Sequence, residues 1–142
     1  MSESFNLERF IDVQETGYER ALSEISNGKK ESHWMWYVFP QIRGLGFSQT
    51  SMFYAITDIH EAEEFLKHPV LGDRLIRICN ALLANKSSDA MQIFGSPDNV
   101  KLRSSMTLFS SLNINPVFDQ VLHKFFQGER DARTLQIIAG NN

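Results

Sequence analysis

The sequence contains a single cysteine, Cys79, in a chain of 142 residues. One cysteine excludes an internal disulfide and a cysteine-rich metal site, and its place in an apolar stripe predicts a buried, unreactive thiol. The histidines His60, His68 and His123 are isolated, and no His-Glu-x-x-His motif or carboxylate cluster of metal-ligand type occurs. We therefore expect neither a bound metal nor a cofactor.

Three further absences limit the class of protein. The chain lacks the run of about 18 apolar residues that a membrane-spanning helix needs. Its start has neither the positively charged region nor the apolar region of a signal peptide. These features predict a soluble, cytoplasmic protein that does not contact membranes. The 14 basic residues are scattered and face 17 acidic ones, for a net charge of −3, so we expect no nucleic-acid partner.

Apolar residues, by contrast, are abundant. Hydrophobic residues make up 42% of the chain and aromatic residues 11%, among them eleven phenylalanines. A chain of this length has the size of one domain and buries roughly two-thirds of its unfolded surface. We predict a single domain over residues 1–142, with an ordered core from about residue 5 to residue 138.

The spacing of these apolar residues is helical. They recur at i, i+3 and i+4 along most of the chain, and residues 36–39 are the one stretch that suggests a strand. The pattern predicts an all-α fold of about seven to eight short helices that do not form a regular up-and-down bundle. Two amphipathic helices are expected before Gly28, and the stripe within residues 71–83 predicts the central helix of the core.

Polar residues mark where helices begin and which sides face solvent. Serine and aspartate accept hydrogen bonds from the free N–H groups of a first helical turn, and four precede apolar runs: Ser32, Ser48, Asp58 and Ser96. Pro97 after Ser96 strengthens the start of a helix that continues toward Leu112. Farther back along the chain, Glu61, Glu63 and Glu64 are expected on the solvated side of their helix.

Both tryptophans lie in residues 32–41, where rings surround His33 and Gln41, and Arg43 with a glycine-rich turn follows. In a helix, one side would carry His33, Trp36, Tyr37 and Pro40. One interpretation is that the segment is the aromatic centre of the core. The other is that His33 and a tryptophan face a pocket, where the histidine acts as acid, base or hydrogen-bond partner.

A second group of polar residues follows Gly95. The expected helix N-terminus offers free backbone N–H groups, and Lys101 and Ser105 lie one turn apart, with Arg103 and Ser104 beside them. Such a surface can hold a phosphate or carboxylate. Because Asp98 already places a negative charge in the first turn, the anion would lie farther along, near Lys101 and Arg103. The alternative is a solvated, well-capped helix, and the order of residues is not that of a P-loop.

Three long motifs resemble the family catalogued as domain of unknown function 1810. They read Gly28-Lys29-Lys30-x-Ser32-His33-Trp34-Met35-Trp36-x-x-Phe39-Pro40-Gln41, His68-Pro69-Val70-Leu71-Gly72, and Phe94-Gly95-Ser96-Pro97-Asp98-x-x-Lys101-Leu102-Arg103-Ser104-Ser105-Met106. The resemblance extends from about Phe5 to Leu135 and implies a compact, mostly helical domain without an established activity. Members are sometimes labelled calpastatin-like, but the aromatic-rich composition is the opposite of a disordered inhibitor segment.

The residues support three classes of function. The first is a pocket for a small anionic or nucleotide-like ligand, with glycosidic or acyl hydrolysis as its sharpest form. It assigns catalysis to His33 and Lys101 and ligand binding to Trp34, Trp36, Gln41, Arg43, Arg103, Ser104 and Ser105. The second is a protein-interaction module that uses the Trp-Met segment or the Phe125-Phe126 face, with no particular partner indicated. The third is a fold in which all these residues are core. The first requires the tryptophan segment to meet the Lys101 helix.

Overall fold

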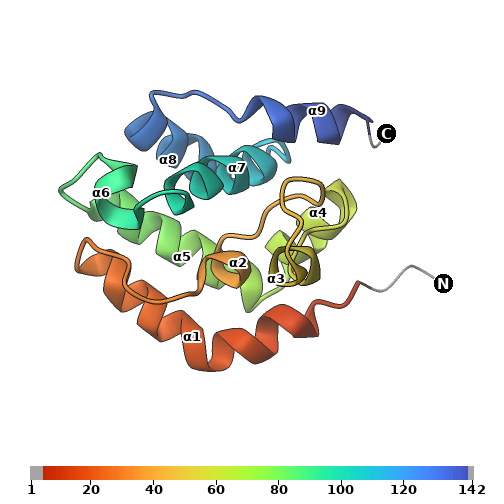
Figure 1. The fold of residues 1–142 in the computed structure, drawn as a ribbon, viewed down its shortest axis with the longest axis horizontal. Helices are drawn as coiled ribbons and strands as arrows, with labels where there is room; N and C mark the ends of the chain where they lie inside the picture. The colour runs from red at the N-terminus through yellow and green to blue at the C-terminus, as the bar shows by residue number, and fades with distance from the viewer. Residues whose placement is uncertain (1–4, 141–142) are drawn as a thin grey trace.

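The computed structural model describes residues 5–140 and shows an all-α domain, as the sequence predicts. Within that range there are nine helices, slightly more than expected (Figure 1). They are α1 (Glu8–Ser26), α2 (Met35–Val38), α3 (Gln49–Phe53), α4 (Ile59–Lys67), α5 (Leu71–Ala84), α6 (Ala90–Phe94), α7 (Asp98–Ser110), α8 (Val117–Phe126) and α9 (Ala132–Gly140). The helices differ in length and direction and form no regular bundle (Figure 1).

The first helix corrects one prediction. Instead of two amphipathic helices there is one helix of 19 residues, α1, whose buried face continues through Gln14 and Tyr18. The helix continues through Gly17. The absence of a side chain there leaves room for Tyr37, since a Cβ at Gly17 would lie 2.3 Å from the Tyr37 hydroxyl. The Gln14 side chain donates a hydrogen bond to the Tyr37 carbonyl at 2.8 Å. Gln14 and Gly17, in the middle of α1, therefore allow the helix to pack closely against the tryptophan segment.

Helices α5 and α7 form the interior of the domain. Helix α5 packs against α1, α4 and α8, and α7 packs against α4, α6, α8 and α9. In Figure 1 both lie between α1 at one side and α9 at the other. The apolar stripe of α5 is buried, as predicted, and Cys79 within it is fully covered. Burial raises the pKa of the Cys79 thiol well above its usual value, which keeps it protonated.

Helix α7 is more deeply buried than a solvated, capped helix would be. All residues from 104 to 110 are buried, including Ser104, Ser105, Thr107 and Ser110. The Thr107 hydroxyl donates a hydrogen bond to the Arg103 carbonyl at 2.8 Å, which gives this buried hydroxyl a partner inside the helix. The small side chains of α7 allow four neighbouring helices to approach it closely. Because many of these side chains are polar, the sequence of α7 does not indicate that the helix is central.

Two of the four expected caps are present. The Ser48 and Asp58 side chains accept hydrogen bonds from the first turns of α3 and α4. The prediction that Ser32 and Ser96 cap helices was wrong. Helix α2 begins at Met35 with Trp34 at its N-cap, and the Ser32 hydroxyl donates a hydrogen bond to the Glu24 carboxylate. Pro97 rather than Ser96 occupies the N-cap position of α7.

Glu61 is a further correction, because it is not on a solvated side. Glu61 is only 1% exposed. Its carboxylate pairs with Arg9 at 2.8 Å and accepts a hydrogen bond from the Thr57 N–H at 2.7 Å. A buried carboxylate needs such partners, since an unpaired charge in the interior is costly. The pair fastens α1 to the start of α4.

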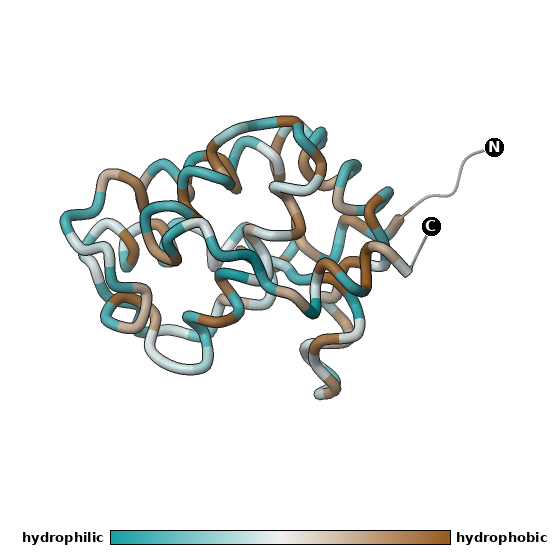
Figure 2. Tube along the Cα trace, turned by 90° about the horizontal axis from the view of Figure 1, so that it is seen from above, coloured by the Kyte–Doolittle hydropathy of each residue, from teal (hydrophilic) through white to brown (hydrophobic). Residues whose placement is uncertain are grey.

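Hydrophobic and hydrophilic residues alternate along most of the helices in Figure 2, as amphipathic helices require. Among residues 5–140, no helix combines the length and the hydropathy needed to cross a membrane.

The contact between α4 and α5 gives a test of the fold. A Cβ at Gly72 would lie 1.9 Å from the Leu66 carbonyl oxygen, so Gly72→Ala must force the two helices apart. We expect the free energy of unfolding to fall by about 3 kcal/mol, measured by urea denaturation at pH 7. Gly140→Ala is the matched control, because a Cβ there meets nothing within 4 Å. Equal stability of the two variants would contradict the close approach.

Candidate functional site

The tryptophan segment is mostly not helical. Helix α2 covers only Met35–Val38, so the prediction that one helix carries His33, Trp36, Tyr37 and Pro40 on the same side is wrong. Trp34 precedes the helix and is 1% exposed, packed against Phe39 and Phe94. Trp36 is half-buried. The two tryptophans thus have different roles: Trp34 belongs to the core, and Trp36 reaches the surface.

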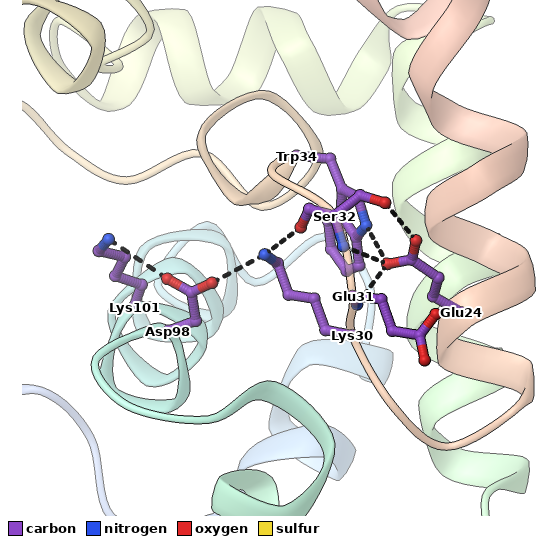
Figure 3. Close-up of polar contacts among 7 residues, drawn as sticks. All are labelled: Glu24, Lys30, Glu31, Ser32, Trp34, Asp98 and Lys101. Atoms are coloured by element: carbon purple, nitrogen blue, oxygen red, sulfur yellow. Dashed lines mark hydrogen bonds and ion pairs between the residues drawn. The ribbon is translucent and has the colours of Figure 1, made fainter.

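A single carboxylate holds this segment against α1. Glu24 accepts hydrogen bonds from the Ser32 hydroxyl at 2.5 Å, the Glu31 N–H at 2.7 Å, the Trp34 indole at 2.8 Å and the Ser32 N–H at 3.0 Å. Burial by itself would raise the pKa of Glu24. The four hydrogen bonds outweigh that effect and lower the pKa from 4.5 to about 2. Glu24 is therefore a charged acceptor that fixes where the segment runs (Figure 3).

From this point a chain of charged contacts leads to α7 (Figure 3). Lys30 donates to the Ser32 carbonyl at 2.5 Å and pairs with Asp98 at 2.9 Å, and the other Asp98 oxygen pairs with Lys101 at 3.3 Å. Each lysine also lies over a tryptophan. The Lys30 Nζ is 4.9 Å from the Trp34 ring centroid, and the Lys101 Nζ is 3.9 Å from that of Trp36.

A pocket of about 260 Å³ opens where Trp36 meets α7. Four residues named from the sequence line it: Trp36, Gln41, Lys101 and Ser104. The remaining lining comes from Leu45, Gly46, Pro97, Val100 and Asp131. We call it the Trp36 pocket. Residues from the first third and the last third of the chain meet there.

The other five residues named from the sequence do not line the Trp36 pocket. His33 is exposed, whereas Trp34 and Ser105 are buried, and the Ser105 hydroxyl has no hydrogen-bond partner among the described residues. Arg103 pairs with Glu129 at 3.0 Å. Arg43 lines a different pocket. The aromatic and basic segments therefore meet, but through Trp36 and Lys101 without His33.

Asp131 was not anticipated as a site residue. Its N–H donates to the Thr107 hydroxyl at 2.9 Å, which ties the start of α9 to α7. Its Oδ2 accepts the N–H of Thr134 at 2.9 Å and the Thr134 hydroxyl at 2.5 Å. The Asp-x-x-Thr spacing is a signal for a helix start. The same spacing does not indicate that the first residues of α9 lie against Thr107.

Comparisons with known proteins agree with this fold. Residues 4–138 match the family described as "Protein of unknown function (DUF1810)". The chain belongs to the DUF1810 family. A search of curated proteins found no match. The crystal structure of the conserved hypothetical protein Rv1873 from Mycobacterium tuberculosis is similar to this DUF1810 protein, with a TM-score of 0.94 and 39% identity over 96% of this chain and 99% of that one.

Within residues 5–140 of this DUF1810 protein, no group of three or more His, Cys, Asp or Glu side chains is arranged to hold a metal ion. The chemistry that the Trp36 pocket offers is one indole face, one ammonium, one carboxylate, one amide and one hydroxyl. These groups can bind and orient a polar molecule by hydrogen bonds and charge.

The Glu24 contacts of this DUF1810 protein predict a pH dependence. Because the folded-state pKa is lowered, the stabilisation is complete above pH 4.5 and is lost as the pH falls from 4.5 toward 2. We expect about 2 to 3 kcal/mol of the unfolding free energy to disappear in that window. Denaturant unfolding of wild type and Glu24→Gln should show a difference at pH 7 that shrinks at pH 2.5.

Glu31→Gln is the matched control, because Glu31 is a neighbouring exposed carboxylate whose side chain makes no hydrogen bond or ion pair among the described residues. It should follow wild type at every pH. A constant difference between Glu24→Gln and wild type from pH 7 to pH 2.5 would refute the role of the ionised carboxylate.

Proposed function

We propose that this DUF1810 protein binds a small nucleotide-type ligand in the Trp36 pocket, one that combines a flat ring, hydroxyl or amine donors and an anionic group. The observation that carries the proposal is the position of the Lys101 ammonium, 3.9 Å from the Trp36 ring centroid, at a pocket that Gln41, Ser104 and Asp131 also line. A flat apolar wall with a few convergent polar groups is the usual composition of a small-molecule site.

The charge balance favours an anion. Asp98 is shared by two lysines, Lys30 at 2.9 Å and Lys101 at 3.3 Å, so one negative charge faces two positive ones. The three groups together carry one excess positive charge. Lys101 lines the pocket and Lys30 does not, and the Asp131 carboxylate also lines it. The excess positive charge therefore favours an anionic group beside Lys101, with the uncharged donors of the ligand beside Asp131.

The Asp131 carboxylate in the same lining favours a ligand that also donates hydrogen bonds. The Asp131 Oδ2 is engaged by Thr134, whereas its Oδ1 has no hydrogen bond among the described residues. A hydroxyl or amine of the ligand can donate to this oxygen, as ribose hydroxyls do to carboxylates. The volume of 260 Å³ lies just below the usual range of about 300 to 1,000 Å³, which suits one ring with its substituents rather than a dinucleotide.

The proposal is limited to binding. The hydrolytic form of the hypothesis needs His33 as an acid or base next to the ligand, and His33 is exposed outside the pocket lining. The interaction-module alternative has little support at the faces first considered, because Trp34, Met35 and Phe125 are buried.

Binding can be tested with AMP, adenosine and ribose 5-phosphate as probes. We expect AMP to raise the unfolding free energy by about 2.7 kcal/mol at a hundred times its dissociation constant, and adenosine, which lacks the anion, to bind about tenfold more weakly. AMP should also quench tryptophan fluorescence. Since Trp34 is buried, the quenching should vanish in Trp36→Phe while the fold is retained.

Lys101→Met should abolish the preference for AMP over adenosine. Arg103→Met is the matched control, because Arg103 lies on the same helix but outside the pocket lining and should leave both affinities unchanged. Thermal shifts that are the same in wild type, Lys101→Met and Trp36→Phe, or no shift with any of the three probes, would count against the proposal.

A further inference from the structure

A second pocket shares Gly46 with the first and is lined by residues of α3 and of the segment before it. Its volume is about 470 Å³, and three large apolar side chains line it: Phe47, Met52 and Phe53. Arg43 and Gln49 supply its charged and polar groups. We call it the Phe47 pocket.

The apolar lining is unusually exposed. Phe47 is 82% exposed, Phe53 56% and Met52 54%, and these three neighbours are all found at one pocket. Single exposed apolar residues are common on a protein surface, but contiguous ones that form a concave site mark a place where something binds. Among residues 5–140, the Phe53 ring packs edge to face against Tyr54 at a centroid distance of 4.8 Å, and Phe47 makes no such ring contact.

The charged group at this pocket is exposed and has no partner within the described part of the chain. Among residues 5–140, the Arg43 guanidinium makes no hydrogen bond or ion pair, whereas its backbone N–H is fixed to the Ile56 carbonyl at 2.8 Å. A guanidinium presents a planar fork of donors that matches a carboxylate in two parallel hydrogen bonds. The backbone bond fixes the point at which the Arg43 side chain leaves the main chain, and Arg43 lines the pocket together with the apolar residues. The complement is therefore an apolar molecule with a carboxylate at one end.

The area of the exposed apolar lining suits a small molecule better than a protein partner. A large aromatic side chain has about 150 to 250 Å² of surface, so three partly exposed side chains offer less than the roughly 800 Å² that each partner contributes to a stable protein interface. The pocket volume, in contrast, falls within the range of small-molecule sites.

We propose that the Phe47 pocket binds a small apolar carboxylate, such as a medium-chain fatty acid, whose carboxylate pairs with Arg43 and whose chain covers Phe47, Met52 and Phe53. This site is distinct from the Trp36 pocket and does not depend on the function proposed there.

The probe is sodium octanoate below its micelle concentration, titrated into ¹⁵N-labelled full-length protein, with octanamide as the uncharged counterpart. Octanoate should shift the backbone amides of residues 43–53 and bind about tenfold more tightly than octanamide. Arg43→Gln should remove that preference. Met52→Ala should weaken both probes about fivefold through lost apolar contact, since each buried methylene contributes on the order of 0.8 kcal/mol.

Two variants serve as matched controls. Met91→Ala removes a methionine of nearly equal exposure, 51%, from α6, and Arg133→Gln removes an exposed arginine that has no ion pair among the described residues. Both should bind octanoate as wild type does. The proposal is overturned if octanoate and octanamide bind equally, if Arg43→Gln behaves like Arg133→Gln, or if the shifts centre on Trp36 and residues 97–104 of the Trp36 pocket and not on residues 47–53. A dimer in sedimentation that Phe47→Ser dissociates would assign the patch to a second copy of the chain instead.

Discussion

The position of the candidate site depends on one carboxylate. Glu24 accepts hydrogen bonds from Glu31, Ser32 and Trp34, a segment that has almost no regular secondary structure of its own. Without helical hydrogen bonds, the backbone N–H groups of this segment need another acceptor. The Glu24 side chain, on the last turns of α1, supplies it and holds Trp34 (Figure 3). The segment continues from there to Trp36, whose ring lies beside Lys101 of α7.

Charge sharing extends this arrangement to the other half of the chain. Asp98 joins Lys30, which follows α1, to Lys101 on α7, and both lysines lie over tryptophans of the same segment. A lysine over an indole keeps its ammonium near a ring that attracts it electrostatically, so its side chain is less free to move. The Trp36 pocket therefore has a cation that is held in place before any ligand arrives, which reduces the entropy lost on binding.

The sequence predicted what depends on local pattern. Apolar spacing identified the helical fold and the stripe of α5, and Ser48 and Asp58 were correctly placed at helix starts. Burial that depends on distant partners was missed. Glu61 reads as a solvent-facing residue until Arg9 is known to lie beside it, and the serines of α7 read as polar until four helices are seen to surround them. The contact between Trp36 and Lys101 was a hypothesis from the sequence, and no sequence feature indicated that Asp131 would line the same pocket.

The two pockets share one support, the contact between Ile42 and Ile56. These residues form a parallel β-bridge, in which Arg43 donates its N–H to the Ile56 carbonyl and Ile56 donates its own to the Gln41 carbonyl, each at 2.8 Å. In extended chain, alternate residues face opposite sides, so the burial of Ile42 turns Gln41 and Arg43 outward. Gln41 then lines the Trp36 pocket and Arg43 the Phe47 pocket. A shift of one residue in this pairing would bury both polar side chains and expose Ile42. The register of a single bridge thus determines which polar side chain of this segment each pocket presents, although neither Ile42 nor Ile56 lines either one.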